Sequence, residues 1–413
     1  MDLNVNVRNA DVVTIKIPFN RELRSSLHRD NFKSGVILTL EGGGHLGFGE
    51  APTLALPSYG PDFTNGAFVA VELFLEMAKG YYESNSKEIT IPVGDFIGRL
   101  LQSYRGNRPA IAAIEMALLD LYARQNSIGP LETIAQYLNH GEVEYGVGAG
   151  ALVDRSGDLL DFELEPQGGS LGFLPLSGLE GAEADDSYDY SQYLALIESG
   201  FRRIKVKVDG SKGGSILGSL AKVCELNQGF VELSVDANCS LRQPFLLESI
   251  YDIGFSYVED PYEFDSLSNL ADSLSNKSGR VALDGCLTSL PVVSDYIKLV
   301  NFDIGVLKLD RMGSILEVVR SANALALAGK NFYIGGMYDS PILRRLNGNL
   351  IRVLRPTEAS DLGADGDYFD CELLPSALRM DDGRLTLPGG VGLCGIFLPN
   401  EDQIGISTSL LFV

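Results

Sequence analysis

Strand-like and helix-like segments alternate through the second part of the chain, and this feature limits the fold most strongly. From residue 143 onward, short β-branched and apolar runs alternate with longer segments of helical periodicity. Strands that alternate with helices are typical of a parallel sheet, because each helix returns the chain to the same edge. The pattern predicts strands at 143–152, 203–208, 231–236, 255–259, 280–284, 302–307 and 331–335. It predicts helices at 187–199, 214–226, 242–252, 264–276, 288–297 and 312–327.

A further strand near residues 351–361 completes about eight strand–helix units, the number that closes a (β/α)8 barrel. An open doubly wound sheet is the alternative fold. Such a sheet usually has a glycine-rich phosphate-binding turn after its first strand, and no GxGxxG motif follows residues 143–152. We therefore expect a (β/α)8-type barrel domain over residues 143–384.

The first part of the chain has a different pattern. Period-two alternation predicts an antiparallel meander with strands at 12–17, 35–40 and 46–50. The polar segments 21–33 and 51–65 connect and follow these strands, and loops of this length on a small sheet are candidate lids.

A helical region follows the meander. Residues 109–121 are apolar around most of the helical circumference and begin with Pro109, which predicts a buried helix. Residues 1–142 are therefore expected to form a small α+β domain. The tail, residues 385–413, returns to turns and short strands.

Composition excludes several classes of function. A net charge of −22 disfavours nucleic-acid binding and docking on anionic membranes. No apolar run approaches the roughly 20 residues that span a bilayer, and residues 1–9 lack a signal-peptide core. The five cysteines form no CxxC pair, which favours a reduced cytoplasmic location. The acidic, glycine- and serine-rich stretch 154–189 reads as an insertion or surface loop.

Charged residues stand at the ends of five successive predicted strands. They are Lys207, Asp236, Glu259, Asp284 and Lys308, and they lie 29, 23, 25 and 24 residues apart. Each step matches about one strand–helix unit, so all five side chains are expected at the carboxyl-terminal rim of the barrel, where barrel enzymes place their active sites.

This arrangement predicts a metal-assisted acid–base site. Three carboxylates ionise close together only if a cation compensates them, and an all-oxygen donor set selects Mg²⁺, or Mn²⁺, over zinc. Lys207 and Lys308 flank the carboxylates, so they are expected on opposite sides of the substrate. The divalent cation should lower the pKa of Lys207, with help from the ammonium group of Lys205, and so suit Lys207 to act as a general base. The metal would stabilise the oxyanion formed when a proton leaves the carbon next to a carboxylate.

These residues resemble a known family. The segments Lys205–Lys207, Asp236–Asn238 and Glu259–Pro261, with Asp284 and Lys308, are similar to the enolase superfamily and its muconate-lactonising subgroup. The resemblance implies a Mg²⁺ ion held by the three carboxylates. It also implies an N-terminal capping domain that the C-terminal tail completes. Residues 47–52 and 112–120 look like the third strand and the buried helix of that cap.

Within the subgroup, residues 308–315, 335–340 and 360–361 look most like o-succinylbenzoate synthases. The resemblance implies a lyase that dehydrates a cyclohexadiene carboxylate in menaquinone biosynthesis, with Lys207 removing the α-proton and Lys308 stabilising the enediolate. The small carboxylate substrate is expected to contact five further residues: Ser25, Tyr59, Asn238, Gly336 and Met337.

The sequence departs from the family pattern at two places. Gly285 and Cys286 follow the third predicted metal ligand, where the family usually has an acidic or amide residue and a serine. Arg344 and Arg345 are more basic than expected at a strand end, and we interpret them as solvated rather than as partners of a second substrate carboxylate.

Three alternative functions stay open. Opposed lysines also serve an N-acylamino acid racemase or a dipeptide epimerase. Dipeptide epimerases tend to carry two aspartates one residue apart at the eighth strand, whereas residues 361–363 provide only Asp361. A histidine-based branch is disfavoured because His28, His45 and His140 all lie in the expected cap. A non-catalytic binding barrel would be signalled by loss of a lysine or a metal ligand, and none is lost.

Overall fold

The structure is a computed structural model of the 413-residue chain. The residues that it describes are 2–24, 29–82, 84–85, 88–140, 174–175, 198, 203–229, 231–364, 369, 378–381, 384–387, 389–396 and 399–412. The predicted strand at 143–152, the predicted helix at 187–199 and the acidic stretch at 154–189 fall wholly or almost wholly outside these residues, and so does Ser25.

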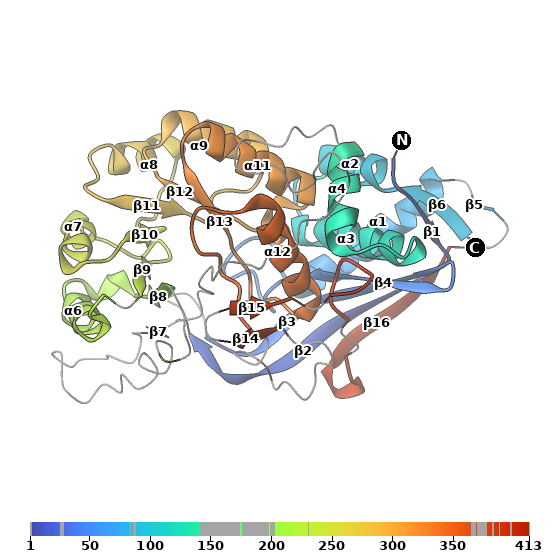
Figure 1. The fold of residues 1–413 in the computed structure, drawn as a ribbon, viewed down its shortest axis with the longest axis horizontal. Helices are drawn as coiled ribbons and strands as arrows, with labels where there is room; N and C mark the ends of the chain where they lie inside the picture. Colours follow the sequence, from blue (N-terminus) through green and yellow to red (C-terminus); the bar gives the residue numbers. More distant parts are fainter. Residues whose placement is uncertain are drawn as a thin grey trace.

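The N-terminal meander is confirmed as part of a four-stranded antiparallel sheet. It contains β2 (Asn9–Arg24), β3 (Arg29–Gly42) and β4 (His45–Ala51), and β16 (Ile404–Leu411) from the tail pairs with β2. In Figure 1 the red β16 accordingly runs beside the blue β2, although the two strands lie at opposite ends of the sequence.

The predicted polar loop at 21–33 is wrong. β2 and β3 continue into it as a ladder in which Leu23 pairs with Asp30 and Arg24 pairs with Arg29. Antiparallel pairing uses backbone groups, so polar side chains did not exclude a strand here. The two strands therefore occupy residues 21–24 and 29–33 of the range that was expected to be a loop.

Four helices accompany the N-terminal strands: α1 (Thr64–Tyr81), α2 (Val93–Ser103), α3 (Arg108–Gln125) and α4 (Pro130–His140). The buried α3 confirms the prediction at 109–121, with Pro109 in its first turn. A Cβ atom at Gly47 or Gly49 of β4 would lie 2.4 or 1.9 Å from a carbonyl oxygen of α3, so only glycine permits this contact. A smaller sheet contains β1 (Asn4–Val7), β5 (Ser84–Asn85) and β6 (Glu88–Pro92).

The alternating region forms a seven-stranded sheet whose described pairs are all parallel. Its strands, in spatial order, are β7 (Leu174–Pro175), β8 (Arg203–Lys207), β9 (Glu232–Asp236), β10 (Tyr257–Glu259), β11 (Arg280–Leu283), β12 (Ile304–Leu307) and β13 (Asn331–Ile334). The intervening helices are α6 (Ser215–Asn227), α7 (Pro244–Ile253), α8 (Leu267–Leu274), α9 (Leu290–Leu299) and α11 (Ile315–Leu327). Figure 1 shows them along the outer side of the curved sheet. The predicted strands from 203 to 335 are thus confirmed.

Two elements after β12 and β13 differ from the prediction. A short helix, α10 (Leu309–Met312), precedes α11, and α12 (Pro341–Leu354) covers the start of the strand expected at 351–361. The Ser340 side chain caps α12 and Pro341 begins it, and both residues are typical of a helix start. Among the described residues after α12, the backbone nitrogens of Glu358 and Asp361 donate hydrogen bonds to β13 and continue the sheet, and closure into a (β/α)8 barrel stays a prediction.

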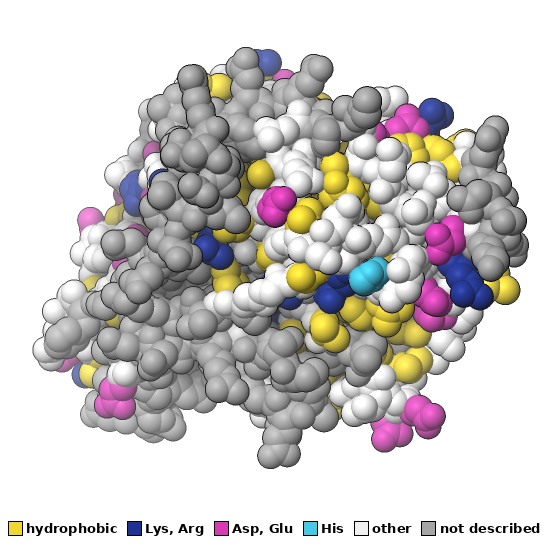
Figure 2. Space-filling model, turned by 45° about the vertical axis from the view of Figure 1, so that its right-hand side comes forward, with side chains coloured by type: hydrophobic (Ala, Val, Ile, Leu, Met, Phe, Trp, Pro, Cys, Tyr) yellow, Lys and Arg dark blue, Asp and Glu magenta, His cyan; other side chains and the backbone are white. Residues whose placement is uncertain are grey.

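A hairpin of β14 (Arg379–Asp381) and β15 (Arg384–Thr386) and a 3-10 turn at Glu401–Gln403 complete the described elements near the C-terminus. Among the helices that the structure describes, none combines the length and the apolar character needed to cross a membrane. On the face drawn in Figure 2, the described acidic and basic side chains lie interspersed among polar and apolar groups.

Candidate active site

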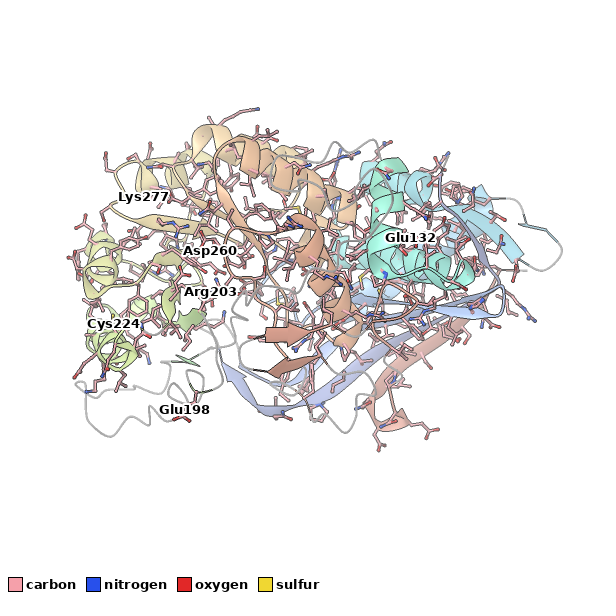
Figure 3. The ribbon with its side chains drawn as sticks, in the orientation of Figure 1. Glu132, Glu198, Arg203, Cys224, Asp260 and Lys277 are labelled. Atoms are coloured by element: carbon pink, nitrogen blue, oxygen red, sulfur yellow. The ribbon has the colours of Figure 1, made fainter. Side chains whose placement is uncertain are left out.

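The inner face of β8 carries three cationic side chains. Arg203, Lys205 and Lys207 alternate with Ile204 and Val206, so they share one face of the strand. Arg203 and Lys205 are 0% and 1% exposed, and the Lys207 side chain is 16% exposed. Burying three cations is costly unless negative charge lies nearby. Carboxylates at the ends of the neighbouring strands supply this charge. Figure 3 locates this part of the sheet through the labels on Arg203 and on Asp260, just after β10.

Each predicted metal-ligand carboxylate has its own ammonium partner. Lys207 Nζ lies 2.5 Å from Asp236 Oδ2, and Lys205 Nζ lies 2.6 Å from Glu259 Oε2. Lys308 Nζ lies 2.7 Å from Asp284 Oδ2. The strand register explains the proximity, since Asp236 pairs with Lys207 on one side and with Glu259 on the other.

Asp361 is the counter-ion at the inner end of this group. Its carboxylate accepts hydrogen bonds from Arg203 Nη2 at 2.6 Å and from Lys205 Nζ at 2.7 Å. The hydroxyl of Tyr333 donates to Glu259 Oε2, and Arg203 donates to the hydroxyl of Tyr257. Because cations of the chain itself engage Asp361, its carboxylate is poorly placed to receive a substrate ammonium group.

Asp284 is bound from three directions. Besides Lys308, Arg311 donates to its Oδ1 atom at 2.7 Å and to its backbone carbonyl at 2.6 Å, and the hydroxyl of Tyr59 donates to Oδ2 at 2.9 Å. Burial opposes ionisation here, but Arg311 and Lys308 outweigh it and hold the pKa of Asp284 below its usual range. Arg311 was missed from the sequence. The available signal was its position three residues after Lys308, which places both on one side of a helical turn.

The expected lowering of the Lys207 pKa depends on a divalent cation bound beside it, and it stays a prediction. Burial lowers the pKa of Lys207, but the adjacent Asp236 carboxylate outweighs burial, so the net shift is upward. Lys205 is itself paired with two carboxylates, which offset its charge. The pKa of Glu259 is also raised, to about 7. Burial is the largest cause, the nearby carboxylates of Asp236 and Asp284 add to the rise, and the Lys205 ammonium offsets it only in part.

The donor set fits a hard divalent cation by its chemistry. Asp236, Glu259 and Asp284 present only oxygen atoms at neighbouring strand ends, and Asn238 adds a buried amide oxygen that accepts no hydrogen bond from the described part of the chain. With the carboxylates turned toward separate ammonium groups, no set of three or more His, Cys, Asp or Glu side chains among the described residues is arranged to hold a metal. An ion at this position would replace the ammonium groups as counter-charge.

One pocket brings most of the predicted residues together. Lys205, Lys207, Lys308, Asp236 and Glu259 line it, and so do four of the predicted substrate contacts: Tyr59, Asn238, Gly336 and Met337. Ser25, the fifth, lies outside the described residues.

The loop between β13 and α12 lies against this pocket. A Cβ atom at Gly335 would lie 2.7 Å from Lys308 Cε, so glycine lets the loop approach that lysine. Asp339 Oδ1 accepts a hydrogen bond from Met337 N at 2.8 Å, which fixes the loop from within.

The interpretation of Arg344 and Arg345 as solvated is wrong. They are 3% and 6% exposed. Arg344 donates to the carbonyls of Asp339, Gly363 and Ala364, and Arg345 donates to those of Gly389, Gly390 and Cys394. Both lie on α12, where a strand end had been expected, and their side chains bind backbone carbonyls of neighbouring loops. Arg344 also lines the pocket.

The departure at Gly285 has a local explanation. Asp260 accepts hydrogen bonds from the backbone nitrogens of Asp284 and Gly285, both at 2.9 Å. A Cβ atom at position 285 would lie 3.2 Å from Asp260 Oδ2, which is a tight contact. Glycine therefore suits a loop in which Asp260 holds the backbone of Asp284.

Comparisons with known proteins find relatives that match most of the chain. An N-succinylamino acid racemase of Thermus thermophilus is 25% identical over 395 residues, covering 94% of each chain. An o-succinylbenzoate synthase of Bacillus subtilis is 22% identical over 387 residues, covering 92% of this chain and 90% of its own. The crystal structure of a muconate lactonizing enzyme from Pseudomonas fluorescens, complexed with muconolactone, has a TM-score of 0.75 at 16% identity and covers 94% of this chain and 96% of its own.

Together with a family match, these relatives confirm the resemblance to the enolase superfamily and are consistent with the muconate-lactonising subgroup. Residues 190–398 match the family described as enolase C-terminal domain-like, and this match spans the parallel strands from β8 onward. The chain therefore belongs to the enolase C-terminal domain-like family.

Proposed function

We propose that the chain is an o-succinylbenzoate synthase, a lyase that dehydrates a cyclohexadiene carboxylate in menaquinone biosynthesis. The single observation that supports it most is the placement of Lys207 and Lys308. They come from β8 and from the end of β12, with Asp236 and Glu259 on the strands between them, and all four line one pocket. The Bacillus subtilis relative bears the same enzyme name.

The proposed reaction begins with proton removal. Lys207, in its neutral form, takes the proton from the carbon next to the substrate carboxylate, and the C–H electron pair moves into an enediolate. Lys308, as the ammonium, stabilises the negative charge from the other side. A bound Mg²⁺ ion would supply the positive charge that offsets the three carboxylates and the developing enediolate.

The second step completes the dehydration. The Lys207 ammonium returns its proton to the departing hydroxyl group, the C–O bond breaks and water leaves. The enediolate electron pair forms the new ring double bond, and the ring becomes aromatic. Lys207 ends in its neutral form, so one lysine serves as base and then as acid.

Lys205 has a supporting role in this proposal. It is 1% exposed, and its ammonium group is shared by Glu259 and Asp361. We assign it the task of holding Glu259 in place beside Asp236, rather than proton transfer.

An N-acylamino acid racemase is the second candidate. Opposed lysines can exchange an α-proton from either face, and the Thermus thermophilus relative is named as an N-succinylamino acid racemase. A dipeptide epimerase is less well supported, because Asp361 is engaged by Arg203 and Lys205. A non-catalytic barrel is disfavoured because each of the five rim residues is present.

A two-substrate assay tests the proposal. Dehydration of the cyclohexadiene carboxylate is followed by ultraviolet absorbance, and racemisation of N-succinyl amino acids is followed by optical rotation on separate samples. Dehydration with a kcat/KM well above that of racemisation supports the proposal. Racemisation alone would replace it with the second candidate, and inactivity in both assays with Mg²⁺ or Mn²⁺ present would favour the binding barrel.

A further inference from the structure

Tyr338 holds an unusual backbone conformation beside the candidate active site. Its φ angle is 53°, in the left-handed region that glycine, asparagine and aspartate adopt most readily. A tyrosine there costs roughly 1 kcal/mol or more, and such residues persist where the surroundings fix them. Tyr338 lines the pocket in the loop after β13.

Two further aromatic rings continue from Tyr338. The ring of Phe19, on β2, meets Tyr338 edge-on with centroids 5.6 Å apart, and Phe19 also stacks on Phe369 at 5.6 Å with an interplanar angle of 20°. We call these three residues the aromatic wall. They come from three distant segments of the chain, and the side-chain amide of Asn20 donates to the Phe369 carbonyl at 2.9 Å, which holds two of the segments together.

Tyr338, one member of the aromatic wall, lines the same pocket as the proposed base, Lys207. The guanidinium of Arg344 lies 5.6 Å from the ring centre of Phe369, so the wall is also supported from α12. Together these contacts support the Tyr338 ring at the pocket that Lys207 also lines.

We propose that Tyr338 is a specificity-determining residue whose ring, supported by Phe19, selects a planar conjugated ring over an open-chain acyl amino acid. This inference rests on the proposed dehydration, because that reaction turns a cyclohexadiene into an aromatic ring. Aromatic pairs prefer offset or edge-to-face contact and gain energy beyond area burial. The contact therefore strengthens as the ring flattens, whereas an N-succinyl amino acid with an aliphatic side chain, the racemisation substrate of the test, offers no such ring.

The test compares three variants with the wild type. Tyr338→Leu removes the ring, Tyr338→Phe keeps it and removes the hydroxyl, and Tyr81→Leu is the matched control on an exposed tyrosine of α1. For each protein we would measure kcat/KM for dehydration and for racemisation, and the Kd of o-succinylbenzoate by calorimetry. Thermal unfolding verifies that every variant is folded.

The expected result is selective loss. Tyr338→Leu should lower kcat/KM for dehydration and weaken o-succinylbenzoate binding by about fivefold, the size of an aromatic contact. Racemisation should change by less than about twofold, and Tyr338→Phe and Tyr81→Leu should resemble the wild type.

Equal losses for both substrates in Tyr338→Leu would show a structural role and overturn the inference, and so would unchanged o-succinylbenzoate binding. If the wild type performs no dehydration, the proposed function fails. The binding measurement still decides the inference in that case, because it needs no turnover.

Discussion

The ammonium group of Lys33 lies 3.1 Å from Glu50 Oε1, and the two side chains are only 2% and 0% exposed. Lys33 stands on β3 and Glu50 on β4, yet both hold the loop that lines the candidate active site. Lys33 donates to the Met337 carbonyl at 3.3 Å, and Glu50 accepts from the backbone nitrogen and the hydroxyl of Ser340. The N-terminal sheet thus fixes the loop that carries Tyr338.

Removing one partner of this pair should destabilise the fold. Glu50→Gln leaves the Lys33 ammonium group buried without its counter-ion, so we expect the free energy of unfolding to fall by about 3 kcal/mol. Urea unfolding measures the change. The double variant Lys33→Met with Glu50→Gln should recover part of the loss, because it removes the buried charge.

Glu263→Gln is the matched control for this prediction. Its partner is Arg242, and the two side chains are 67% and 57% exposed, so the change should stay below about 1 kcal/mol. A loss in Glu50→Gln no larger than in this control would contradict the prediction.

The sequence predicted the repeating part of the fold well. Each strand–helix unit of the parallel sheet has about the same length, so the spacing predicted that Lys207, Asp236, Glu259 and Lys308 share one rim, and these four residues line one pocket. A repeating fold gives the sequence a regular alternation of apolar strands and amphipathic helices. Charged residues at the ends of the apolar strands are easy to recognise in that pattern. The third predicted ligand, Asp284, lies beside them in contact with Lys308.

Irregular and long-range features gave no comparable signal. Asp361 lies beyond α12, so no spacing rule connected it with Arg203 and Lys205. The Asp236 carboxylate raises the pKa of Lys207 because the two side chains lie next to each other in three dimensions, and the sequence alone does not show this contact. The pairing of Leu23 with Asp30 was missed because polar side chains do not prevent backbone pairing between strands. The helix over 341–354 was missed because residue propensities predict secondary structure only weakly, and here the capping residue Ser340 begins a helix.

The buried carboxyl of Glu115 should give the fold a pH-dependent stability. Glu115, on α3, accepts hydrogen bonds from Tyr137, from the Ser314 hydroxyl and from the backbone nitrogen of Ile315, which begins α11. Burial raises the pKa of Glu115 to about 7, although these donors favour the ionised form, and the nearby Glu317 carboxylate adds to the rise.

The sign follows from proton binding. Below the ordinary pKa of 4.5 both the folded and the unfolded chain hold the proton, and between there and about 7 only the folded chain does. The contribution of Glu115 to the free energy of unfolding therefore falls as pH rises from 4.5 to about 7, by at most about 1.4 kcal/mol per pH unit. Above about pH 7 this contribution no longer changes with pH. Glu115→Gln should remove this slope from the free energy of unfolding measured in urea.

Glu132→Gln is the control for the pH prediction. Glu132 is exposed on α4 and is labelled in Figure 3. Its substitution should leave the slope unchanged. Parallel stability curves for wild type and Glu115→Gln between pH 4.5 and 7 would show that Glu115 does not titrate in this range.

Magnesium should stabilise the fold through the three carboxylates. At a free Mg²⁺ concentration one hundred times Kd, the free energy of unfolding should rise by about 2.7 kcal/mol, and a chelator should reverse the rise. Asp284→Asn should abolish the increment, because it removes one proposed ligand.

Asp272→Asn, at an exposed position on α8, should keep the whole increment. The comparison uses the Mg²⁺-dependent change within each protein, so any loss of stability caused by unpairing Lys308 and Arg311 cancels. An undiminished increment in Asp284→Asn would remove Asp284 from the proposed ligand set.

Loss of the Lys207 amine should stop proton transfer without removing the metal ligands. Lys207→Ala leaves Asp236, Glu259 and Asp284 in place, so kcat for dehydration should fall by about 10³-fold, while calorimetry should still detect Mg²⁺ binding. Lys207→Arg restores a cation beside Asp236, but its guanidinium stays protonated at neutral pH and should be equally inactive. Lys298→Ala, a 70% exposed lysine on α9, should behave like the wild type. Substantial turnover in either Lys207 variant would assign the base to another residue.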